Sequence, residues 1–172
     1  PFAVIAVDEE SFAHWNEPLI TPRDSLAKII EFARASGAKL IFVDVELTRF
    51  QDGKAFRQEC RDKNKPATCA ELDPGDARLA QVLTQQQTSS PPIILARTIV
   101  STRDSASGEP RRTVRPSFLD PILGPDHPGV YWASPLYSVD KDHVIRRERL
   151  WELACNCTDV EAIPAVELLA VA

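Results

Sequence analysis

The sequence is poor in the residues that most catalytic motifs need. It has no methionine, three histidines and six glycines that are never clustered. Without a glycine cluster there is no phosphate-binding loop, and no Gly-x-Ser-x-Gly elbow is present. His14 lies in a helix-like segment, His127 beside a proline and His143 in a predicted turn, so none is placed as a general base. These absences argue against nucleotide-binding enzymes and nucleophilic hydrolases.

Positive charge and long apolar runs are also missing. The net charge is −5 with an isoelectric point near 5.2, which disfavours nucleic-acid binding. No run reaches the roughly 18 apolar residues of a membrane span, and no signal peptide is visible. The chain begins without methionine and stops inside the apolar run "AIPAVELLAVA". We interpret residues 1–172 as one excised domain, a length that can bury its own core.

The four cysteines are Cys60, Cys69, Cys155 and Cys157. Cys60 and Cys69 flank the polar loop "RDKNKPAT", where a buried free thiol would be out of place. We expect these two to form a disulfide, which indicates an oxidising compartment. Cys155 and Cys157 form a strained small ring if they pair with each other, and otherwise cross between loops. The spacings do not match the usual Cys-x2-Cys of zinc sites, and four free thiols remain the alternative.

The first fifty residues predict a strand, a helix and a second strand. Residues 2–7 form an apolar run of strand length, typical of a strand that is covered on both faces. Apolar residues in 21–39 recur at helical spacing, with Thr21 or Pro22 at the start and Gly37 at the end. Residues 40–47 read as another buried strand. This order predicts a βαβ unit with parallel strands.

The rest of the chain predicts further mixed elements. We expect a helix in 73–86 with Asp76 as its cap, a strand in 91–100, a hairpin tip in 101–115 and a closing helix in 162–172. Two extended segments within 129–153 meet at the turn "VDKDH" and predict an antiparallel hairpin. The predicted fold class is therefore α/β, with a mixed, largely parallel sheet flanked by helices and an antiparallel C-terminal hairpin.

Acidic residues follow both strands of the predicted βαβ unit. If these strands are neighbours, Asp8 and Asp44 meet at the carboxyl edge of the sheet, where open α/β sheets bind ligands. Two carboxylates suit Mg²⁺, so a magnesium-dependent phosphotransferase or phosphatase is one alternative function. The motifs of such enzymes are incomplete, however, because "DEES" has Glu where a second Asp belongs. The commoner explanation is that both aspartates cap or bridge local groups, and we expect no metal or other cofactor.

Arginines supply two further hypotheses. Those in 97–115 can line a hairpin and bind an anion or a lipid headgroup, although a solvated charged hairpin is the commoner explanation. Arg146 and Arg147 follow the predicted turn. If one of them points inward it needs a carboxylate partner, and Asp8 or Asp44 is the natural candidate.

Several of these stretches resemble the second type of CHASE domain, the cyclase/histidine-kinase-associated sensory extracellular domain. The similar stretches are "VIAVDEESF", "TPRDSLAKIIEFARASGAKLIFVDVEL" and "VDKDHVIRRERL". The matching positions are Asp8 and Ser11, Pro22 and Arg23, Gly37 to Lys39 with Asp44, and Asp140, Asp142, Arg146 and Arg147. The chain departs from the family at "NEPLITPR", where a Trp-Pro segment is common, and at His143, which replaces a turn glycine.

The resemblance implies an extracytoplasmic, periplasmic or cell-surface sensor of a membrane-bound bacterial protein. Its output would be an adenylate or diguanylate cyclase, a histidine kinase or a serine/threonine kinase. The implied partners are a small-molecule or peptide signal, the protein's own transmembrane helices and its cytoplasmic output domain, with a homodimer possible and no nucleic acid. The family supplies no catalytic residues. A structural dimerisation module is the third alternative.

Overall fold

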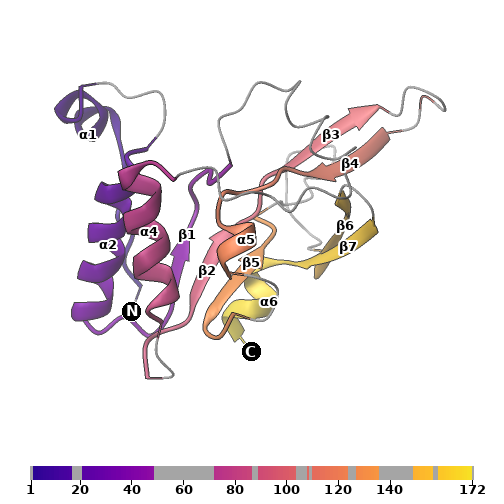
Figure 1. Cartoon of the computed structure of the whole chain (residues 1–172). Coiled ribbons are helices and arrows are strands. Elements are labelled where there is room, and N and C mark those ends of the chain that lie inside the picture. Colours follow the sequence, from indigo (N-terminus) through magenta and orange to yellow (C-terminus); the bar gives the residue numbers. More distant parts are fainter. Residues whose placement is uncertain are drawn as a thin grey trace, which may run out of the picture.

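The computed structural model describes most of the chain, as residues 2–16, 21–48, 72–86, 89–103, 108, 110–123, 127–135, 149–156 and 159–171. Helices and strands are interspersed along it (Figure 1). The helices are α1 (Glu9–His14), α2 (Arg23–Ala35), α4 (Pro74–Thr84), α5 (Asp120–Leu123) and α6 (Val166–Val171). The strands are β1 (Ile41–Val43), β2 (Ile93–Ala96), β3 (Ile99–Arg103), β4 (Pro110–Val114), β5 (Val130–Ala133), β6 (Trp151–Asn156) and β7 (Asp159–Pro164).

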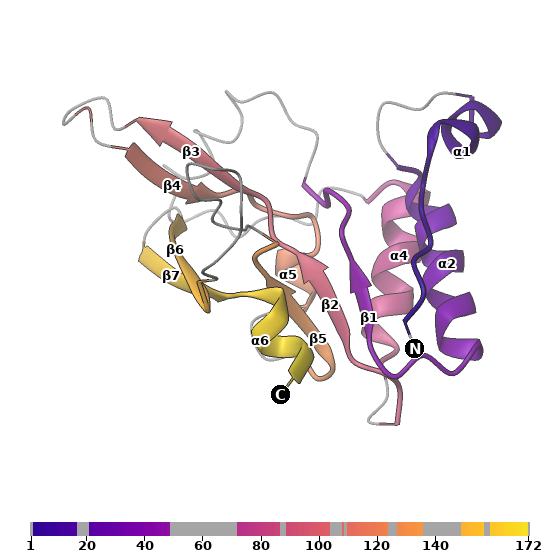
Figure 2. The ribbon, with the colours of Figure 1, turned by 180° about the vertical axis from the view of Figure 1, so that it is seen from behind.

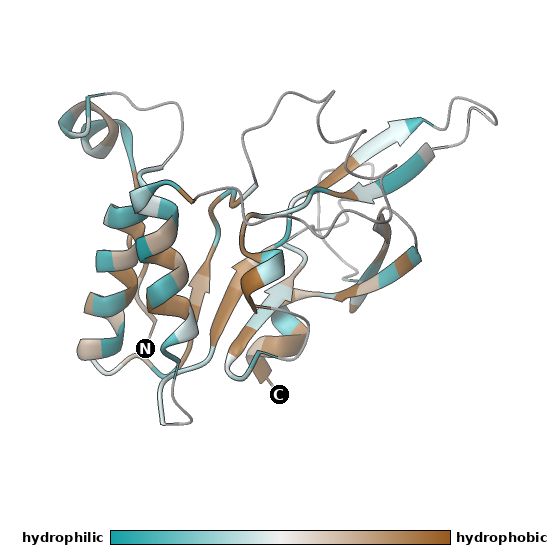
Figure 3. Cartoon of the chain, viewed as in Figure 1, coloured by the Kyte–Doolittle hydropathy of each residue, from teal (hydrophilic) through white to brown (hydrophobic). Residues whose placement is uncertain are grey.

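Three of the strands form a parallel sheet in the order β1-β2-β5. All four residues of β2 are buried, as expected for a central parallel strand with both faces covered. The paired helices α2 and α4 pack on one face of this sheet, and α6 packs on the other (Figures 1 and 2). Residues in α2 and α4 alternate between hydrophilic and hydrophobic in Figure 3, whereas β2 is hydrophobic over its length.

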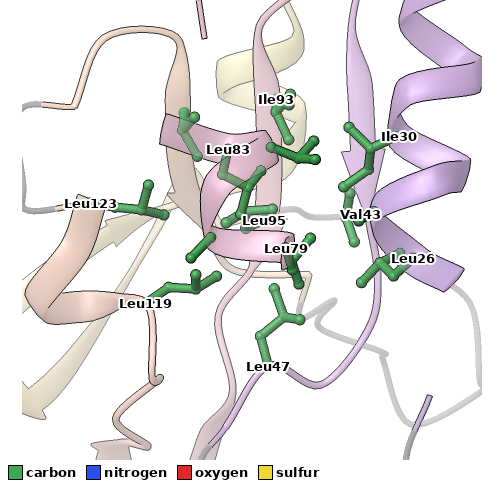
Figure 4. Packing of buried hydrophobic residues seen from close by; sticks show 14 of the residues in the cluster. Leu26, Ile30, Val43, Leu47, Leu79, Leu83, Ile93, Leu95, Leu119 and Leu123 are labelled. Atoms are coloured by element: carbon green, nitrogen blue, oxygen red, sulfur yellow. The ribbon is translucent and has the colours of Figure 1, made fainter. Parts of the chain in front are cut away.

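The main hydrophobic core lies between the α2–α4 pair and the parallel sheet. Figure 4 shows its aliphatic side chains meeting from both layers. Leu26 and Ile30 come from α2, and Leu79 and Leu83 come from α4. The sheet and the segments around it contribute Val43, Leu47, Ile93, Leu95, Phe118, Leu119, Leu123 and Val130.

Local signals account for the ends of both long helices. Gly37 follows α2 with φ +80°, a left-handed conformation that glycine adopts without strain. The side chain of Asp73 accepts a hydrogen bond from the Asp76 N–H at 2.9 Å and caps α4, with Pro74 in the first turn. The sequence prediction that Asp76 is the cap was wrong by three residues. A cap must precede the first helical residue, and Asp76 already lies within the helix.

The other four strands form a mixed sheet in the order β3-β4-β6-β7. β3 and β4 are an antiparallel hairpin, which confirms the hairpin expected in 101–115. The predicted strand in 91–100 divides at Arg97, because β2 belongs to the parallel sheet and β3 to the mixed one. The two sheets meet where Ser134 N donates to Pro164 O at 2.8 Å.

The predicted fold class is confirmed, but the first predicted strand is wrong. Residues 2–8 have no strand structure (Figure 2), and Phe2, Val4 and Ile5 are exposed. The βαβ unit that the structure describes is instead β1–α4–β2. An apolar run of strand length forms a strand only if another strand pairs with it. In this fold β1 pairs with β2.

The C-terminal hairpin is antiparallel as predicted, but it lies further along the chain. β6 pairs with β7, with Trp151 opposite Pro164 at one end and Asn156 opposite Asp159 at the other. β5 is instead a parallel neighbour of β2. The expected turn "VDKDH" falls outside the described residues. The closing helix is confirmed as α6, although it starts only at Val166 because the residues before it extend β7.

Candidate functional site

Three arginines from different segments gather at the carboxyl edge of the parallel sheet. Arg23 is the first residue of α2, Arg97 directly follows β2, and Arg115 directly follows β4. Each forms an ion pair with a carboxylate at this edge. Loops beyond the carboxyl ends of parallel strands are where open α/β sheets bind ligands. This edge is therefore the candidate functional site.

Arg23 is buried, with 5% of its surface exposed. Its Nε lies 3.7 Å from Asp76 Oδ1, and its guanidinium carbon lies 5.7 Å from the centre of the Phe118 ring. Burial lowers the pKa of Arg23 below its ordinary value, while the charges of Asp76, Asp73 and Glu46 oppose that change. Within the described ranges, Nε and Nη1 have no hydrogen-bond partner. Arg23 therefore holds donors that an added acceptor could use.

Arg97 is buried too, and both of its terminal nitrogens are paired, whereas its Nε has no hydrogen-bond partner among the described residues. Nη1 and Nη2 donate to the two carboxylate oxygens of Asp120 at 2.5 and 3.1 Å, a bidentate pair. The guanidinium carbon lies 4.6 Å from the centre of the Trp132 ring, within the range of a cation–π contact. The Ser117 N–H donates to Asp120 Oδ2 at 2.8 Å and fixes the carboxylate. This arrangement connects the end of β2 to α5 and β5.

Ser117 joins the loop after β1 to the segment before α5. Its Oγ donates to Leu47 O at 2.5 Å and accepts from the Leu119 N–H at 3.2 Å. Nearby, Arg115 Nη1 lies 3.3 Å from Glu46 Oε1, and both side chains are more than half exposed. The edge thus has a rigid buried interior at Ser117 and Arg97, and an exposed rim at Arg115.

The chemistry of this edge favours binding over catalysis. Guanidinium groups donate hydrogen bonds and cannot accept protons at neutral pH, so they bind anions and carbonyl oxygens. Nowhere in the described part of the chain do three His, Cys, Asp or Glu side chains cluster closely enough to hold a metal ion. The charged groups of the edge therefore suit an anionic or carbonyl ligand, and Arg23 keeps two buried donors for which the described residues supply no acceptor.

The two acidic residues predicted for the site, Asp8 and Asp44, lie in different local environments. Asp8 caps α1, and its Oδ1 accepts from Ser11 N at 3.0 Å and from Ser11 Oγ at 2.8 Å. The backbone hydrogen bond from Ser11, followed by the one from its side chain, lowers the pKa of Asp8. Asp44 directly follows β1 and is exposed. The structure does not place the two aspartates on neighbouring strands, because residues 2–8 are not a strand.

The structure describes only some of the other predicted site residues. Arg23 lies at the sheet edge as described above. Arg146 and Arg147, the predicted partners of Asp8 or Asp44, lie outside the described residues. Cys155 is a free cysteine in β6. Cys60, Cys69 and Cys157 also lie outside the described part, so the pairing of Cys60 with Cys69 remains a prediction.

The sequence does not predict the buried ion pair between Arg97 and Asp120 or the contact of Arg97 with Trp132. Arg97 was grouped with the arginines of a solvated hairpin, yet it is 7% exposed. One signal was available, since Arg97 directly follows the apolar run "IILA" and an arginine there needs a carboxylate partner. Asp120 is 23 residues away along the chain, and no local pattern identifies it.

Comparison with known proteins gives one match. A family model described as the CHASE2 domain matches residues 1–172, the whole chain. No curated protein and no solved structure was found to match the sequence. None of the helices in the described ranges is long and apolar enough to cross a membrane.

Proposed function

Because the chain belongs to the CHASE2 domain family, whose members are extracellular sensory domains, we propose that it is the ligand-sensing part of a membrane-bound bacterial signalling protein. The match to the whole chain is the observation that carries this proposal. The output would be an adenylate or diguanylate cyclase, a histidine kinase or a serine/threonine kinase. The domain itself is sensory, and its carboxyl-edge arginines suit binding.

A sensor needs a ligand that binds two conformations with different affinities. We propose that a small molecule or peptide provides this difference by binding at the carboxyl edge. The Arg23 donors that lack a hydrogen bond within the described ranges, Nε and Nη1, are buried at the start of α2 and beside α4. A ligand that engages them would change the contact between the two helices. The signal would then pass to the protein's own transmembrane helices and cytoplasmic output domain, in a homodimer.

Location is tested on the complete natural protein in a bacterial host. External protease is added to intact spheroplasts, and fragments of this domain are detected with an antibody against it. We expect digestion while a cytosolic marker protein stays intact. Digestion only after the membrane has been permeabilised would contradict the extracytoplasmic location.

Signalling is tested by changing Arg23 while keeping its charge. Arg23→Lys removes the planar guanidinium, and we expect it to change the signal-dependent output of the complete protein. Arg78→Lys is the matched control, because Arg78 forms a half-exposed pair with Glu31 on the same two helices. Output that responds identically in the wild type and both variants would remove the carboxyl edge from the sensing mechanism.

A further inference from the structure

A second candidate binding site lies on the mixed sheet, away from the carboxyl edge. A hollow of about 410 Å³ opens between β4 and the start of β6. These two strands share one registered pair, Thr113 with Cys155, and the hollow lies toward their beginnings. Its described lining consists of Arg112, Arg149, Leu150, Trp151, Glu152 and Leu153. Its volume falls within the range of small-molecule pockets.

The charges in this hollow are unequal. Glu152 is buried, with 6% of its side chain exposed, and it lies between two arginines. Arg112 donates to Glu152 Oε2, and Arg149 Nη1 lies 3.4 Å from the same oxygen. Among the described lining residues, two guanidinium groups around one carboxylate leave one positive charge over, in a chain whose net charge is −5. Glu161 lies on the neighbouring strand opposite Ala154 and does not line the hollow.

Among the described residues, the two arginines keep donors for a further acceptor. A guanidinium has five N–H donors, and the contacts with Glu152 occupy only some of them. Arg149 is 57% exposed at its side chain and Arg112 is 36% exposed. Both can therefore reach a ligand in the hollow without leaving Glu152.

Apolar side chains provide the rest of the wall. Leu150, Trp151 and Leu153 are each more than half exposed to solvent. Along β6 the buried Glu152 and Ala154 alternate with the exposed Trp151 and Leu153, so the exposed pair share the opposite face of the strand. Large apolar residues exposed together beside a hollow are typical of binding surfaces.

We propose that this hollow binds an amphipathic organic anion. A carboxylate or similar head group would be held by Arg149 and Arg112 on the Glu152 side of β6. The apolar body would pass over Leu150 and around the start of β6 to Trp151 and Leu153, since residues of both strand faces line the hollow there. The surplus positive charge favours an anion over a cation, and the exposed apolar wall favours an alkyl or aryl body over a small inorganic ion. The proposal names a ligand class for the sensory role above and rests on that role for its biological purpose.

Decanoate is the probe, used with the 172-residue chain below the concentration at which decanoate forms micelles. Calorimetric titration is expected to show saturable binding of one decanoate per chain, with a change in tryptophan emission. Hexanoate should bind more weakly, by roughly twofold for each methylene removed, because the apolar wall is open to solvent. Decylammonium should not bind at this site. Non-saturable uptake, or equal binding of decylammonium, would overturn the proposal.

Two variants with matched controls locate the binding. Arg149→Gln removes the surplus charge but leaves the Arg112–Glu152 pair, and we expect binding to weaken roughly five- to twentyfold. Its control is Arg78→Gln, which removes a half-exposed arginine on α4, outside both proposed sites. Leu153→Ser should weaken binding, whereas Val160→Ser changes an equally exposed residue outside the lining. Unchanged affinity in both test variants, or equal losses in the controls, would refute the site.

Other outcomes separate this proposal from the sensory role. Circular dichroism melts verify that each variant is folded. Vesicles of anionic phospholipid test a bilayer as the source of the anion, and binding to vesicles without binding of free decanoate would overturn the proposal. Decanoate binding with no change in the output of the complete protein would support the pocket and contradict its sensory role. A functional sensor that does not bind decanoate would leave the sensory role intact and remove the pocket.

Discussion

The ion pair between Arg97 and Asp120 gives the sharpest test of how the carboxyl edge is held together. In Asp120→Asn the side chain keeps its shape and can still accept from the Ser117 N–H, but it loses its charge. Arg97 then remains buried with a single neutral acceptor where it had a bidentate carboxylate. We expect Asp120→Asn to change the stability of the fold, because Asp120 is not among the residues proposed to bind a ligand at Arg23 or in the hollow beside β6.

The expected loss follows from the burial of the two partners. Removing one partner of a buried ion pair costs about 3–5 kcal/mol. Asp120 is 31% exposed at its side chain, so water compensates for part of this loss, and Asn retains a hydrogen bond. We therefore expect the free energy of unfolding to fall by about 2–3 kcal/mol. For a chain of this length, that corresponds to a melting temperature roughly 4–12 °C lower.

Urea unfolding followed by far-ultraviolet circular dichroism measures this loss. The control is Asp24→Asn, which removes the exposed pair between Asp24 and Lys28 on α2 and should cost only about 0.5 kcal/mol. Combining Asp120→Asn with Arg97→Gln completes a double-mutant cycle, in which the two losses should be strongly non-additive. A loss below about 1 kcal/mol for Asp120→Asn, or additive losses, would refute the claim that this pair holds the edge together.

Two further predictions concern local backbone structure. Gly129→Ala should lower the free energy of unfolding by about 2 kcal/mol, because φ is +74° and a Cβ would lie 2.9 Å from Gln86 Cγ. Gly37→Ala has a similar φ of +80° but open space around the added Cβ, so it should cost only about 1 kcal/mol in the same urea assay. Equal losses in the two variants would contradict the argument that crowding by Gln86 adds to the cost. The capping bond from Ser11 to Asp8 should stabilise α1 above pH 3.8, the ordinary pKa of an aspartate, and this stabilisation should disappear as the pH falls through the lower pKa of Asp8 in the folded chain. A carboxyl titration by NMR would show this as a midpoint below 3.8. Ser11→Ala removes the Oγ hydrogen bond but keeps the capping N–H, so it should move the midpoint upward, and an unchanged midpoint would contradict the bond from Ser11 Oγ.

The elements with strong local signals were predictable from the sequence. α2 has apolar residues at helical spacing and a glycine two residues after its end, so its position follows from local physics alone. β2 is an apolar run between prolines and an arginine, and all its residues are buried. In both cases the burial pattern and the boundary residues agree, which explains why the α/β class could be predicted.

Residues 2–8 show where this reasoning fails. Their composition is as strand-like as that of β2, but a strand also needs a ladder partner and a layer that covers it. Both depend on residues far away in the sequence, and β1 takes β2 as its partner. The same limit explains the displaced hairpin, because β6 can pair with either flanking segment on composition alone and the structure selects β7.

The arginines of residues 97–115 show most clearly why the site itself could not be predicted. They are neighbours in sequence, yet Arg97, Arg112 and Arg115 pair with carboxylates that lie 23, 40 and 69 residues away. The partners belong to α5, to β6 and to the loop after β1. These arginines therefore connect separate elements of both sheets, where the sequence suggested one solvated hairpin. A ligand that competes for one of these guanidinium groups would weaken a contact between elements, which is the kind of change that a sensor has to transmit.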